Sequence, residues 1–233
     1  MISVLDPGGF GSVSINKSIT IDGGGIEGSI LASLSAGVTI NAAATDQVVL
    51  RNLTIFGIGN GTIGVRVLNA AKVVLEHVDI SGFNNGIENP GPTELTVVDS
   101  EIHGNRSYGI LMVASSGRLT VEQSRILDNG SYGVRIEGTS IASVRRSVLS
   151  GNAVMGVSSN GGGFLSIDDC LVSNSQYGIG SGDRATVSVS NSSIVNTTVR
   201  ALFDGGGPLL TYGNNRLSGN AVDGAFSGAV SLR

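Results

Sequence analysis

The sequence predicts an all-β fold in which short strands wind into a parallel β-helix, a solenoid of stacked coils. A phrase of the chain recurs, as VVDSEIHGNRSYGILM at 97–112 and VEQSRILDNGSYGVRI at 121–136. Runs such as RLTVEQSRI alternate apolar and polar residues, the period of a strand with one buried face. Gly and Asn separate the runs, and no repeat holds the roughly 10–15 residues of a crossover helix.

Eight repeats align in register with spacings of 22–25 residues. The first column of the alignment holds Leu50, Leu75, Val97, Val121, Val144, Ile167, Val189 and Tyr212. The sixth column holds Ile55, Ile80, Ile102, Ile126, Leu149, Val172, Ile194 and Leu217. Further along each repeat comes a Gly followed by an apolar residue, from Gly64-Val65 to Gly178-Ile179. Because coils stack about 4.8 Å apart, we expect the recurring residues to face inward and the variable ones to face water.

The repeats define the expected domain organisation. Three short strands in each repeat make one coil, so the sequence predicts a single domain over 1–233 with about ten coils. Residues 1–46 are expected to form less regular coils, and residues 47–233 to form the regular ones.

The composition excludes several classes of function. Apolar residues make up 40% and aromatic residues 4%, so Val, Ile and Leu must fill the core. The net charge of −4 gives no basic face for nucleic acid, and no apolar run reaches the roughly 18 residues of a membrane span. The single cysteine, Cys170, excludes an internal disulfide and is too little for a zinc site.

Three further columns carry structural expectations. The fourth column holds Ser in four of its eight positions and Cys170 in a fifth, and we expect the Ser hydroxyls to bond neighbouring backbone inside the helix. The column before it should form a tight bend, because Asn and Asp tolerate left-handed backbone and stacked Asn side chains can bond along the axis. Its members are Asn52, His77, Asp99, Gln123, Arg146, Asp169, Asn191 and Asn214. Tyr108, Tyr132 and Tyr177 share another column and are expected to pack on one another.

The repeated phrase at 121–136 and the opening LDPGGFGSVSINKSITIDGGG resemble right-handed parallel β-helix proteins of the pectate-lyase-like superfamily, in particular bacterial repeat proteins. The resemblance implies right-handed winding, which the rule for parallel crossovers also favours. It implies an extracellular or cell-surface location, although MISVLDPGG has no feature of a signal peptide. It also implies that an N-terminal cap is missing, so that open ends of the β-helix could promote self-association.

The candidates for catalysis are charged residues. Asp168 and Asp169 form an obvious acidic pair, but the column of Asp168 also holds Glu122 and Arg145 in preceding coils. We therefore interpret Glu122, Arg145 and Asp168 as a solvated ladder of alternating charge. His77 and His103 have no metal-ligand spacing and are interpreted as surface residues.

The resemblance places a substrate groove over the strand that follows the conserved Gly. The outward residues there are Arg66, Glu88, Leu111, Arg135, Ser158, Gly180 and Phe203, with Glu137 and Asp204 just beyond. Glycoside hydrolysis needs two carboxyls roughly 5–9.5 Å apart, and Glu88 and Glu137 are the candidates, two coils or roughly 10 Å apart. The candidate carbohydrate-binding residues are Arg66, Glu88, Arg135, Glu137 and Phe203.

Two hypotheses for function follow. The first is a non-catalytic scaffold or binding module that engages glycans or a surface, supported by the short turns and by the absence of the GHG and RIK motifs of polygalacturonases. The second is a polysaccharide lyase or glycoside hydrolase, which rests on the resemblance alone. No metal or cofactor is expected, except calcium if the lyase alternative holds, and polysaccharide is the expected partner.

Overall fold

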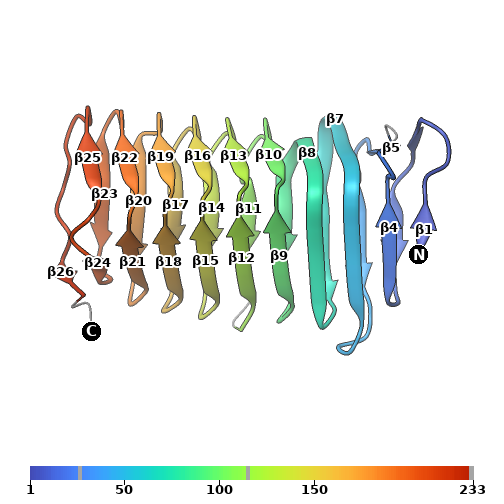
Figure 1. Ribbon diagram of the computed structural model, residues 1–233, viewed down its shortest axis with the longest axis horizontal. Helices are drawn as coiled ribbons and strands as arrows, with labels where there is room; N and C mark the ends of the chain where they lie inside the picture. The colour runs from blue at the N-terminus through green and yellow to red at the C-terminus, as the bar shows by residue number, and fades with distance from the viewer. Residues whose placement is uncertain (26–27, 114–115, 231–233) are drawn as a thin grey trace.

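The computed structural model describes residues 1–25, 28–113 and 116–230. All the named secondary-structure elements in these ranges are β-strands. They wind into a solenoid of about nine coils, close to the ten expected. The coils lie side by side along one axis, with the N-terminus at one end and the C-terminus at the other (Figure 1). The named strands pair in parallel, so the predicted parallel β-helix is confirmed. None of the described residues belongs to a helix long and apolar enough to cross a membrane.

Each coil contributes a strand to each of three parallel ladders. The first ladder contains β1 (Ile2–Ser3), β4 (Ile19–Asp22), the start of β7 (Gln47–Asn69), the start of β8 (Lys72–Asn89), β9 (Glu94–Val98), β12 (Arg118–Glu122), β15 (Ile141–Arg145), β18 (Phe164–Asp168), β21 (Thr186–Ser190), β24 (Leu209–Thr211) and β26 (Gly228–Ala229). The strands β7 and β8 are continuous through all three ladders.

The second ladder begins at the bend that follows the first. It contains β2 (Gly8–Phe10), β5 (Gly28–Leu31), the middle of β7 and β8, β10 (Glu101–His103), β13 (Arg125–Leu127), β16 (Val148–Ser150), β19 (Leu171–Ser173), β22 (Ser193–Val195) and β25 (Arg216–Ser218).

The third ladder contains the strands at the recurring Gly of the repeats, with Ala201 in its place in β23. It contains β3 (Val13–Ile15), β6 (Val38–Asn41), the end of β7 and β8, β11 (Ile110–Met112), β14 (Tyr132–Ile136), β17 (Met155–Ser159), β20 (Tyr177–Gly182) and β23 (Arg200–Gly205).

The register reproduces the predicted columns with one error. The sixth column pairs in order from Ile55 to Leu217, and these side chains are buried up to Ile194. In the first column Val189 pairs with Thr211, so the assignment of Tyr212 was wrong. The coil has one extra residue at Tyr212–Gly213, where Gly213 takes a positive φ of 84°, and register returns at Asn214.

The bend between the first two ladders uses left-handed backbone in seven successive coils. The residues are Asn52, His77, Asp99, Gln123, Arg146, Asp169 and Asn191, with φ between 47° and 54°. The predicted left-handed bend is confirmed for these seven residues, including His, Gln and Arg, whereas the eighth predicted member, Asn214, does not take a positive φ. Bonding between Asn side chains in this column occurs where Asn214 Nδ2 donates to Asn191 Oδ1 at 2.7 Å.

The Ser column beside the bend bonds the coils together, as predicted. The backbone N–H of Val78 donates to Ser100 Oγ at 3.1 Å, and the N–H of Ser100 donates to Ser124 Oγ at 3.2 Å. Cys170 takes the same place in its coil, where its thiol donates to the Asp168 carbonyl. Burial raises the pKa of the Cys170 thiol to about 11, so it remains protonated and serves as a buried structural group.

A second polar ladder inside the β-helix was not predicted. Asn105, Asn129 and Asn152 are at most 2% exposed. The side-chain amide of Asn105 donates to Asn129 Oδ1 at 3.0 Å, and that of Asn129 donates to Asn152 Oδ1 at 3.0 Å. Each Oδ1 also accepts the backbone N–H of the coil before it, at 3.1–3.2 Å. The ladder therefore satisfies polar backbone groups at a buried corner.

Removing one rung should destabilise the fold. In Asn129→Ala the backbone and side-chain N–H groups of Asn105 lose their shared acceptor while buried, which costs about 1–3 kcal/mol. Urea unfolding measures this loss against Asn41→Ala, an exposed control expected to change stability by less than about 0.5 kcal/mol. Equal effects of the two substitutions would show that the ladder contributes no stability.

Candidate functional site

The outward residues of the third ladder form one continuous row along the β-helix. Their Cα atoms pair in register in the order Arg66, Glu88, Leu111, Arg135, Ser158, Gly180 and Phe203. The register thus brings together four of the five candidate binding residues, and Glu137 follows β14 directly. Large side chains stand at Arg135 and Phe203, with only Ser158 and Gly180 between them.

This change in side-chain size creates a cavity, which we call the notch. Arg135 and Phe203 are three coils apart, or about 14 Å between Cα atoms. The cavity between them has a volume of about 300 Å³, and its lining includes Tyr132, Met155 and Asn160. The volume lies at the lower end of the range for small-ligand sites. A side chain at Gly180 would collide with Met155, because its Cβ would lie 2.6 Å from Met155 Sδ.

The Arg135 side chain contacts three neighbouring side chains at the notch. Its guanidinium lies 4.9 Å from the centre of the Tyr132 ring, a cation–π contact. Its Nε is 3.4 Å from Glu137 Oε1, and its Nη1 donates to Ser158 Oγ at 3.4 Å. These contacts hold the side chain along the surface, and only 20% of it is exposed.

Aromatic rings flank the notch at both ends. Tyr108 and Tyr132 stack with ring centres 5.8 Å apart, which confirms the predicted packing for this pair. Tyr177 packs instead against Phe203, at 5.2 Å and edge to face, because Met155 separates it from Tyr132 in the column. Phe203 remains 39% exposed.

The two candidate catalytic carboxylates lie apart, each with its own basic partner. Glu88 Oε1 is 3.8 Å from Arg66 Nε, and Glu88 Oε2 accepts the side-chain amide of Asn85 at 3.0 Å. Glu137 contacts Arg135, and Leu111 occupies the coil between the two glutamates. A catalytic role for Glu88 and Glu137 stays a prediction.

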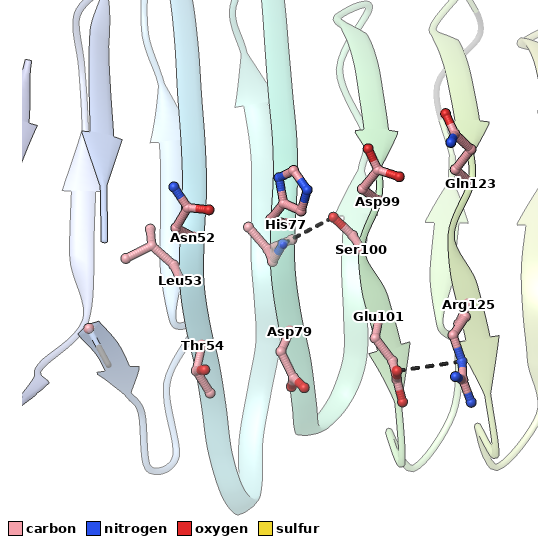
Figure 2. Close-up of a pocket in the computed structure, with 12 residues that line it drawn as sticks. Asn52, Leu53, Thr54, His77, Asp79, Asp99, Ser100, Glu101, Gln123 and Arg125 are labelled. Carbon is pink, nitrogen blue, oxygen red and sulfur yellow. Dashed lines mark hydrogen bonds and ion pairs between the residues drawn. The ribbon is translucent and has the colours of Figure 1, made fainter. Parts of the chain in front are cut away.

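A second concave surface follows the left-handed bend, and sequence reasoning missed it (Figure 2). This bend groove has a volume of about 500 Å³, and its lining includes His77, Asp79, Asp99, Glu101 and Arg125. Asp79 and Glu101 are register partners on adjacent coils. The sequence pattern that could have predicted this groove is the outward column two residues after the bend. It holds the charged residues Asp79, Glu101 and Arg125 in three successive coils.

Two carboxylates of the bend groove, Asp79 and Glu101, each contact a basic side chain. His103 Nε2 lies 3.4 Å from Asp79 Oδ1, and Arg125 Nε lies 3.6 Å from Glu101 Oε2. Within the described residues, no three His, Cys, Asp or Glu side chains are grouped to hold a metal ion. Calcium binding, expected only with the lyase alternative, stays a prediction.

The predicted charge ladder on the first ladder's surface is confirmed. Glu122 pairs in register with Arg145, and Arg145 with Asp168. Glu122 also contacts Arg146, the bend residue of the next coil. Hydrogen bonds from Ser190 and Asn191, at 2.6 and 2.8 Å, lower the pKa of Asp168.

Asp168 should contribute a small acid-sensitive stability. Since its folded-state pKa is below the ordinary 3.8, the contribution is complete above that value and is lost as pH falls through the folded-state pKa. We expect wild type to be more stable than Asp168→Asn at pH 7, with the gap narrowing by pH 3. Urea unfolding of both proteins at the two pH values measures the difference in their free energies of unfolding. A difference that is as large at pH 3 as at pH 7 would contradict this role of Asp168.

Comparison with known proteins agrees with this architecture. The family described as "Right handed beta helix region" matches residues 36–194, so the chain belongs to the right-handed β-helix family. A solved structure with a similar fold is the catalytic domain of a GH87 alpha-1,3-glucanase in complex with tetrasaccharides, at 9% identity and a TM-score of 0.43. The alignment covers 98% of this chain, which spans 63% of that domain. No curated protein matches the chain significantly.

Proposed function

We propose that this protein is a non-catalytic glycan-binding β-helix, and that the outward face of the third ladder around the notch is its binding surface. The observation that carries the proposal is the large–small–small–large sequence of Arg135, Ser158, Gly180 and Phe203 in one register row. It leaves a cavity of about 300 Å³ with an exposed aromatic ring at one end.

The notch combines apolar and polar groups in the way that sugar recognition requires. A pyranose has apolar C–H faces and a rim of hydroxyls, so a suitable site needs an apolar surface beside hydrogen-bonding groups. Phe203 and Met155 supply the apolar surface, while Arg135 and Asn160 supply donors and acceptors. Ligand sites of this kind are mostly apolar, with a few polar groups that fix orientation.

The carboxylates favour binding over cleavage. Acid–base cleavage of a glycosidic bond needs two carboxyls that face one substrate bond from about 5–9.5 Å apart. Glu88 and Glu137 are separated by a coil that presents Leu111, and each is held by an Arg. The pairing suits surface groups that shape a binding face.

Glycan binding can be tested directly on a polysaccharide panel by affinity electrophoresis and calorimetry. Removing the exposed ring in Phe203→Ala should weaken binding about fivefold to thirtyfold, equivalent to about 1–2 kcal/mol for a buried aromatic anchor. The control is Phe164→Ala, because Phe164 is similarly exposed at 43% but lies in β18 of the first ladder.

Three outcomes would contradict the proposal. Absence of binding to any polysaccharide would reject the function, and equal loss in Phe203→Ala and Phe164→Ala would reject the site. Release of reducing ends or unsaturated sugars, abolished in Glu88→Gln or Glu137→Gln, would replace binding by the hydrolase or lyase alternative.

A further inference from the structure

We infer that the notch selects neutral hexose glycans and discriminates against polyuronates, and that Glu137 sets this selectivity by occupying Arg135. The inference rests on the proposed function, because it names the class of glycan bound at the same site. It depends on which partner each charged side chain of the third-ladder face contacts.

Arg135 lines the notch, and Glu137 and the Tyr132 ring face its positive charge, although its Nε makes no hydrogen bond with a described residue. Glu137 Oε1 lies 3.4 Å from its Nε, the Tyr132 ring faces its guanidinium at 4.9 Å, and Ser158 Oγ accepts from its Nη1. A sugar carboxylate would have to displace Glu137 or share one guanidinium with it. Both arrangements place like charges together or leave Glu137 without its partner, which is unfavourable at a partly buried site.

The rest of the face provides no excess of positive charge. Arg66 is paired with Glu88, whose second oxygen accepts from Asn85. In β23, Arg200 and Asp204 stand at opposite sides of Phe203 and contribute one charge of each sign. The six charged residues of this row and its flanks therefore comprise three cations and three anions. They are Arg66, Glu88, Arg135, Glu137, Arg200 and Asp204.

A neutral hexose meets no such penalty. Its apolar face can cover the exposed part of Phe203, which is otherwise in contact with water. Its hydroxyls can donate to Glu137 and accept from Arg135 and Asn160 without separating the Arg135–Glu137 pair. The whole chain carries a net charge of −4, which adds a weak long-range repulsion against a polyanion.

The test compares wild type, Glu137→Gln and Glu122→Gln on neutral glucan, mannan and galactan, and on polygalacturonate and alginate at low salt. Wild type should bind at least one neutral glycan and neither polyuronate. Glu137→Gln should release Arg135 and raise affinity for a polyuronate by about fivefold or more, a gain that 0.5 M salt removes. Glu122→Gln makes the same change in net charge and also releases Arg side chains, but on the first ladder, and it should not reproduce this gain.

The outcomes separate this inference from the proposed function. A wild-type protein that prefers polyuronates overturns the inference and leaves glycan binding intact. An equal gain in Glu122→Gln, or no gain in a Glu137→Gln protein that unfolds in urea like wild type, overturns the selectivity role of Glu137. Failure of wild type to bind any glycan overturns the proposed function itself.

Discussion

The structure depends on one constraint, the close parallel stacking of each coil's backbone on the next. It recurs from coil to coil at the Gly column that opens the third ladder. A Cβ added at Gly64 would lie 2.4 Å from the Gly86 carbonyl oxygen, and one at Gly109 would lie 2.6 Å from the Gly133 carbonyl oxygen. Real Cβ atoms do not approach so closely, so Gly is needed where another strand of this ladder stacks on the coil at the normal spacing. Ala201 takes the position in β23, the last strand of the third ladder in the described residues.

This stacking also determines where function can reside. Inward positions must fit both neighbouring coils, and they are filled by aliphatic, Ser and Asn columns. Outward positions face water and are free to vary from coil to coil, so a change in side-chain size along one outward row produces a cavity without any long loop. The notch between Arg135 and Phe203 arises in this way, from two successive small residues in a rigid ladder. A site on such a scaffold is held by the sheet itself, which favours preorganised binding.

Most of the fold could be predicted from the repeat, because each column reports the same environment several times. The row from Arg66 to Phe203 was predicted for the same reason. Tyr212 was assigned to the first column because its coil carries one inserted residue, while Asn214 still aligns with the bend residues of the other coils. The Asn105–Asn152 ladder was missed because its column holds Asn in only part of the repeats. The column holds Phe83 in the coil before the ladder, and Ser175 and Thr197 in the coils after it. The contacts of Arg135 depend on its rotamer, which no spacing in the sequence determines.

The central claim is that the row of the third ladder binds a sugar at the notch. A crystal structure of the protein soaked with an oligosaccharide from the tightest-binding neutral polysaccharide tests it most directly. We expect a sugar ring against Phe203, hydrogen-bonded toward Arg135 and Asn160, with the Arg135–Glu137 contact retained. A ligand in the bend groove beside Asp79 and Glu101, with the notch empty, would show that the notch is not the binding site.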